Sequence, residues 1–131
     1  MNAGIPTDVA SFVQASFTSV EELELLTLLQ ARPEAEWTSS ALAKELGTTP
    51  ESISRRLAAF AALGIIAPPS SDDPPIIRYA PATSLLAGLL QGVALTYRQR
   101  RIAMVTMIYE RPHDPLRSFA DAFRLRKDGP R

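Results

Sequence analysis

Hydroxyl and guanidinium groups gather in one short segment of this 131-residue chain, TPESISRR at residues 49–56. Hydroxyl groups can hydrogen-bond phosphate oxygens or base edges, and an arginine fork can pair with O6 and N7 of guanine. Arg55 is therefore the candidate to read bases, while Arg56 and Arg78 are candidates to hold phosphates. Glu51 can accept a hydrogen bond from N4 of cytosine. The candidate DNA-binding residues are Thr49, Glu51, Ser52, Ser54, Arg55, Arg56 and Arg78.

Other kinds of site chemistry find little support in the sequence. His113 is the single histidine and the chain has no cysteine, so nothing completes a metal site or a nucleophile–base pair of the usual kind. The nucleotide-binding motifs GxxxxGK[ST] and GxGxxG do not occur. We therefore expect that the protein is not an enzyme and that it has neither a metal site nor a cofactor.

All of the candidate residues except Arg78 fall on, or at the start of, the second of two short helices that the sequence predicts between Thr38 and Ile66. Gly47 ends the first helix, because glycine readily adopts the left-handed conformation that closes a helix. Thr49 caps the second helix, and Pro50 occupies its first position, where a missing N–H is harmless. Three apolar residues share one face of this helix and should be buried, which turns the polar candidates outward. These apolar residues are Ile53, Leu57 and Phe60.

Three segments carry a recognisable pattern: Leu42-Ala43-x-x-Leu46-Gly47, Ile53-Ser54-x-x-Leu57 and Leu63-Gly64-Ile65-Ile66. The pattern resembles the helix-turn-helix of bacterial winged-helix regulators, the MarR-like and ArsR-like superfamily, over about 60 residues from Val20 to Ala80. The resemblance implies a transcriptional regulator that binds double-stranded DNA. The C-terminal motif PLRSFADAFRLRKD also resembles that of small bacterial winged-helix proteins.

Two β-prone runs, Ile65–Ala67 and Ile76–Tyr79, flank a loop rich in proline, serine and aspartate. This arrangement predicts a two-stranded hairpin, the wing, in which the prolines remove ladder donors. We therefore predict a mainly α fold, a winged helix-turn-helix with a two-stranded wing and helical extensions at both ends. The predicted parts are an N-terminal helical arm at residues 1–18, the winged helix-turn-helix domain at 19–80, and a C-terminal long helix plus short helix at 81–131.

The C-terminal region begins with a long helical pattern that Thr83 caps and that runs about 28 residues before Pro112 stops it. A short helix follows at residues 116–126. The apolar stripe of the long pattern exceeds what one small domain needs, so we expect it to form the interface of a homodimer. The expected interface residues are Leu86, Leu90, Val93, Tyr97, Met104 and Ile108.

Charge is unevenly distributed along the chain, although the whole chain is neutral. Residues 1–79 contain 5 Lys+Arg and 10 Asp+Glu, whereas residues 80–131 contain 9 Lys+Arg and 4 Asp+Glu. DNA-binding domains usually carry basic residues around the recognition element, so this distribution supports a second hypothesis. On that hypothesis the chain is a winged-helix interaction module, which binds a protein partner through basic C-terminal helices that include Arg98, Arg100 and Arg101.

The sequence contains no apolar run near the ~18 residues that a membrane span requires, and no recognisable secretory signal. We therefore expect a cytoplasmic protein with no membrane partner. Methionine and aromatic side chains on the long helical pattern could line a small-molecule pocket or could pack in the core. Their helical spacing favours core packing. These side chains belong to Tyr97, Met104, Met107 and Tyr109.

Overall fold

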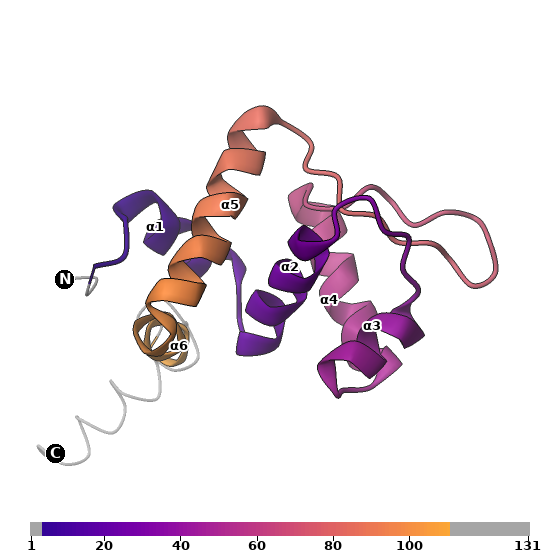
Figure 1. Cartoon of the computed structure of the whole chain (residues 1–131), viewed down its shortest axis with the longest axis horizontal. Helices are drawn as coiled ribbons and strands as arrows, with labels where there is room; N and C mark the ends of the chain where they lie inside the picture. The colour runs from indigo at the N-terminus through magenta and orange to yellow at the C-terminus, as the bar shows by residue number, and fades with distance from the viewer. Residues whose placement is uncertain (1–3, 111–131) are drawn as a thin grey trace, which may run out of the picture.

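The computed structural model describes residues 4–110, and this part of the chain contains six α-helices and no regular strand. Figure 1 shows α2 between the helix-turn-helix on one side and α5 on the other, with α1 and α6 beyond α5. The mainly α prediction is therefore confirmed. The helices are α1 (Thr7–Ser16), α2 (Val20–Ala31), α3 (Ser39–Leu46), α4 (Pro50–Leu63), α5 (Ser84–Gln99) and α6 (Arg101–Tyr109).

The helix-turn-helix consists of α3 and α4, and local sequence signals set its limits. The Oγ1 atom of Thr49 accepts a hydrogen bond from the backbone N–H of Ser52 at 3.1 Å, which caps α4. Gly47 and Gly64 follow α3 and α4 with φ of +70° and +82°, the left-handed conformation expected at these two helix ends. The predicted caps of both helices are confirmed.

A continuous core surrounds α2, whose leucines face both the helix-turn-helix and α5. The three apolar residues predicted to face inward from α4 are buried, with Ile53 and Phe60 fully so. The ring of Phe60 stacks on that of Phe17 with 5.6 Å between centroids, which joins α4 to the segment before α2. Because the inward face of α4 is anchored in this way, its opposite face is held toward solvent.

The wing is less regular than predicted. Its two arms meet at a single antiparallel bridge between Ile66 and Tyr79, and a second bridge joins Ile77 to Trp37. No two-stranded sheet is therefore seen among residues 4–110. Prolines at positions 68, 69, 74 and 75 remove backbone donors from the loop. Beyond the bridge, the arms are joined by a backbone hydrogen bond from the N–H of Ser70 to the carbonyl oxygen of Ile76 at 3.3 Å.

The long helical pattern is divided, contrary to the prediction of one helix that continues to Pro112. Arg100 has φ −132° and ψ 51°, so α5 ends at Gln99 and α6 begins at Arg101. Figure 1 shows α6 crossing the foot of α5 at a sharp angle. This turn lets Met104 and Ile108 enter the core beside α1, and both are buried. Burial of apolar side chains thus offsets the loss of helical continuity.

Two further findings apply to the same range of residues. No helix within residues 4–110 is both long enough and apolar enough to cross a membrane. No three histidine, aspartate or glutamate side chains in that range lie together as a metal ion would require. His113 and the predicted short helix at residues 116–126 lie outside the described part of the chain.

Candidate nucleic-acid interface

The outward face of α4 presents three of the predicted residues at its N-terminal half. Glu51, Ser54 and Arg55 are exposed. The hydroxyl of Ser54 lies 3.3 Å from that of Ser39 at the start of α3, so the two helices meet beneath this face. Arg55 forms no ion pair within residues 4–110, and its guanidinium is therefore available to a ligand. Arg55 is therefore exposed as predicted, and its role in reading bases stays a prediction.

Thr49 has a local structural role in addition to its exposed position. Its hydroxyl oxygen is occupied by the N-terminal cap of α4. The N-terminus of α4 still carries partial positive charge, because the first N–H groups of a helix have no partner within the helix. Thr49 therefore shapes an end of α4 that can accept a phosphate.

Ser52 and Arg56 face α2 rather than solvent. The hydroxyl of Ser52 donates to Oε1 of Glu21 at 2.5 Å, and Nε of Arg56 donates to the same oxygen at 3.1 Å. Nη1 of Arg56 also lies 3.6 Å from Oε2 of Glu22. Only 23% of the Arg56 side chain is exposed. In this structure both residues are engaged within the chain, whereas the sequence suggested that they contact DNA.

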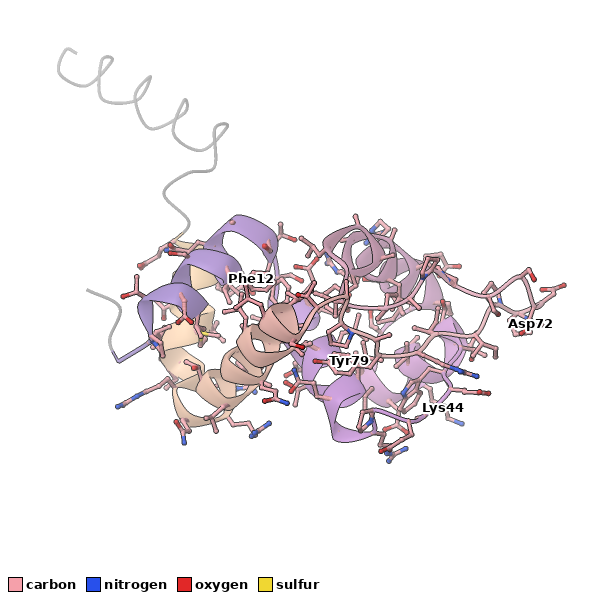
Figure 2. The ribbon with its side chains drawn as sticks, turned by 90° about the horizontal axis from the view of Figure 1, so that it is seen from above. Phe12, Lys44, Asp72 and Tyr79 are labelled. Atoms are coloured by element: carbon pink, nitrogen blue, oxygen red, sulfur yellow. The ribbon has the colours of Figure 1, made fainter. Side chains whose placement is uncertain are left out.

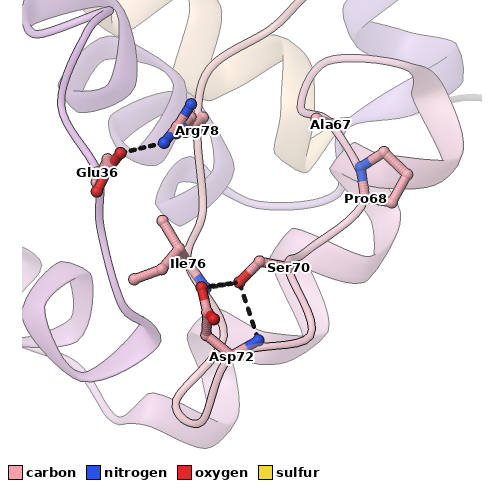
Figure 3. A pocket seen from close by; sticks show the side chains of 7 residues that line it. All are labelled: Glu36, Ala67, Pro68, Ser70, Asp72, Ile76 and Arg78. Atoms are coloured by element: carbon pink, nitrogen blue, oxygen red, sulfur yellow. Dashed lines mark hydrogen bonds and ion pairs between the residues drawn. The ribbon is translucent and has the colours of Figure 1, made fainter.

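Arg78 lies in the wing and is also paired. Its Nη2 donates to Oε2 of Glu36, which precedes α3, across a shallow pocket of about 270 Å³ (Figure 3). The hydroxyl of Ser70 accepts a hydrogen bond from the backbone N–H of Ile76 at 2.9 Å and donates to Asp72 at 3.1 Å. The wing therefore carries its arginine in an exposed ion pair and ends in an acidic tip.

Lys44 is a basic residue of this region that sequence reasoning missed. It is exposed on α3 and forms no ion pair within residues 4–110. Figure 2 shows Lys44 and Asp72 at the same end of the molecule, far from Phe12. The inward stripe of Leu42 and Ala43 could have shown that Lys44 points outward. Together with Arg55 it supplies the unpaired positive charge of the helix-turn-helix.

The residues expected at a dimer interface lie instead within one chain's own core. Five of the six are buried there, and Leu86 is half-buried against them. The apolar side chains that α5 and α6 leave exposed are different ones: Leu85, Leu95, Ile102 and Tyr109. Helical spacing correctly marked the buried stripe, but this chain's own α1 and α2 cover it. The five buried residues are Leu90, Val93, Tyr97, Met104 and Ile108.

The basic residues of the second hypothesis are all exposed, but they are not equivalent. Nη2 of Arg101 donates to Oε2 of Glu24 at 3.1 Å, and its guanidinium lies 4.9 Å above the ring centroid of Tyr97. Arg98 joins these residues around an open pocket of about 650 Å³ between α2 and the α5–α6 turn. Met104, a candidate pocket residue, is fully buried, which favours core packing at that position.

Comparison with solved structures connects this architecture with a known fold. The crystal structure of a MarR family protein from Mycobacterium tuberculosis matches with a TM-score of 0.51, covering 93% of this chain and 84% of that chain at 20% sequence identity. The chain has a MarR-like winged helix-turn-helix fold. Neither the scan against protein-family models nor the search of curated proteins found a match.

Proposed function

We propose that this chain is a dimeric, sequence-specific DNA-binding transcriptional regulator. The observation that carries the proposal is the unpaired, exposed guanidinium of Arg55 on the outward face of α4. The MarR-like fold supports it, because the second helix of a helix-turn-helix enters the major groove with its N-terminal residues toward the bases.

In the proposed complex, Arg55 pairs with a guanine, and Ser54 and Glu51 contact neighbouring base edges. Lys44 and the N-terminus of α4 hold the phosphates on either side. Arg78 can join them only when its ion pair with Glu36 opens. Both side chains of that pair are exposed, so opening it costs little. Each protomer thus makes few ionic contacts, and we expect a shallow dependence of affinity on salt.

The proposed dimer forms through the exposed apolar side chains of α5 and α6. Ile102 and Tyr109 are seven residues apart on α6 and so share a face, and they are 82% and 64% exposed in the single chain. A second copy related by a two-fold axis would cover them and present two α4 helices to successive turns of DNA, about 34 Å apart.

The test is selection of bound duplexes from a random pool, followed by titration of the selected site with Arg55→Ala. Loss of one bidentate arginine–guanine pair should weaken binding by about 1–3 kcal/mol and relax the preference at that base. Arg98→Ala is the matched control, because it removes the same charge from an exposed position on α5, outside the helix-turn-helix. Absence of binding to any duplex at low salt would reject the proposed function.

A second candidate function is the protein-interaction module, and the acidity of the DNA-facing end favours it. Glu45, Glu51, Asp72 and Asp73 are exposed on α3, α4 and the wing, whereas Arg98 and Arg100 are exposed on α5 and at its C-terminal end. Reversing the charge of both arginines should abolish co-purification of a partner while leaving the fold unchanged. Arg101 is not suitable for this test, since its pair with Glu24 stabilises the monomer.

A further inference from the structure

One carboxylate on α2 binds two side chains of α4 at once. Oε1 of Glu21 accepts the hydroxyl of Ser52 at 2.5 Å and Nε of Arg56 at 3.1 Å. Ser52 and Arg56 are four residues apart, so they lie one above the other on the same face of α4. Glu21 therefore fixes a full turn at the N-terminal half of α4, the half that carries Arg55.

A second carboxylate extends this contact toward α1. Glu22 is 4% exposed, and its Oε1 accepts the backbone N–H of Thr18 at 2.6 Å in the link between α1 and α2. Its Oε2 lies 3.6 Å from Nη1 of Arg56. Arg56 is thus enclosed between two carboxylates, which join α4 both to α2 and to the segment before it.

The charge state of Glu21 agrees with this arrangement. Burial raises the pKa of Glu21, but hydrogen bonds from Ser52, Thr48 and Arg56 together with the charge of Arg56 bring that pKa below its ordinary value. Glu21 consequently stays ionised at neutral pH.

We propose that Glu21, Glu22, Ser52 and Arg56 form a clamp that sets the orientation of the recognition helix, so that Arg56 is a positioning residue and not a phosphate contact. This inference rests on the proposed function. Apolar packing beneath α4 resists its removal, but such packing is non-directional and constrains rotation about the helix axis less tightly than hydrogen bonds do. Directional hydrogen bonds to Glu21 fix that rotation, and with it the direction in which the neighbouring Arg55 points.

The first test compares Arg56→Gln with the wild type on the selected duplex and on a random duplex, at several salt concentrations. If Arg56 is a clamp residue, Arg56→Gln should reduce the affinity for the selected duplex roughly tenfold. The affinity for the random duplex and the salt slope should stay unchanged. If Arg56 contacts a phosphate, Arg56→Gln should instead weaken binding to both duplexes alike and lower the magnitude of the salt slope by about 0.9. Such a uniform loss would overturn the inference.

The second test uses Glu21→Gln, for which the two roles predict opposite signs. If Arg56 is a phosphate contact, removing its partner frees it and binding to every duplex tightens. If the cluster is a clamp, binding to the selected duplex weakens. Glu34→Gln is the matched control, because Glu34 is an exposed carboxylate with no ion pair within residues 4–110.

Ser52→Ala completes the set without changing any charge. The clamp predicts a several-fold loss of affinity for the selected duplex and an unchanged salt slope, even where Arg56→Gln reduces folding. Wild-type protein that binds no duplex would reject the proposed function. If the wild type binds a selected duplex and Ser52→Ala and Glu21→Gln bind it equally tightly, the clamp is overturned but the proposed function is not.

Discussion

Arg55 and Arg56 are neighbours in the sequence but lie in opposite environments. Arg55 extends into solvent from the outward face of α4, and Arg56 lies between Glu21 and Glu22 with 23% of its side chain exposed. An arginine held by two carboxylates contributes little net positive charge to the surface around it. In the proposed complex, this difference determines which of the two side chains can reach DNA.

Glu21 should make the stability of the fold depend on pH in the acidic range. Because its folded-state pKa is lowered, the ionised carboxylate stabilises the native state fully above the ordinary pKa of 4.5. That contribution disappears as the pH falls through the lower folded-state pKa. Denaturant titrations of wild type and Glu21→Gln should therefore differ at pH 7 and converge in acid. A constant difference across this range would contradict the assignment.

Sequence periodicity could place Arg55 correctly but not Arg56. The inward stripe at Ile53 and Leu57 determines the opposite face of α4, and Arg55 falls on it. Arg56 falls on the flank, where its surroundings depend on a helix about 30 residues earlier. No local pattern reports that Glu21 approaches this flank, because the approach results from how α2 packs against α4.

At the scale of an element, an exposed ion pair joins the wing to the segment before α3, and opening that pair is testable. Glu36→Gln should release Arg78, raise affinity for any duplex by no more than about fivefold, and steepen the salt slope by about 0.9. The ceiling is low because exposed ion pairs contribute about 0–1 kcal/mol. The measurement is binding to a random duplex across a salt series.

Glu34→Gln provides the comparison for the wing, since it removes one exposed carboxylate two residues away without releasing an arginine. General charge effects should appear in both variants, and the steeper slope only in Glu36→Gln. Identical slopes in the two variants would show that Arg78 does not reach phosphate.

Helix limits were predictable wherever capping residues define them, as Thr49 and Gly64 do for α4. The break at Arg100 was not predictable, because neither proline nor glycine occurs there and the helical pattern continues through it. Tertiary packing produces that break by drawing Met104 and Ile108 into the core. The positions of the two wing arms were predictable, but the two-stranded hairpin was not, because the arms form one bridge and no regular strand within residues 4–110.

At the scale of the whole molecule, the exposed face of α6 is the proposed interface of the dimer. Ile102→Arg should convert the proposed dimer into a monomer, because a buried charge at an apolar interface has no compensating partner. The side chain is 82% exposed in the single chain, so the fold itself should tolerate the change. Sedimentation velocity measures the oligomeric state. The affinity for DNA should also fall, because a monomer presents one α4 helix where the dimer presents two.

Glu34→Arg is the control for assembly, since it changes an exposed residue outside α5 and α6. A monomeric wild type would contradict the proposed dimer. The sequence indicated which residues of the long helical pattern are apolar, but it could not tell whether the covering surface belongs to the same chain or to another. For Leu90 and Val93 the structure assigns that surface to the same chain.

In the proposed complex, the acidic tip of the wing would limit how much of a duplex one protomer can recognise. Asp72 and Asp73 would repel the sugar–phosphate strand beside the groove that α4 would occupy. Each half of the proposed operator is then only a few base pairs long, too short to be rare in a genome. Selectivity must then come from the distance between two such half-sites. Inserting base pairs between the half-sites would therefore weaken binding more than substituting base pairs at their outer edges.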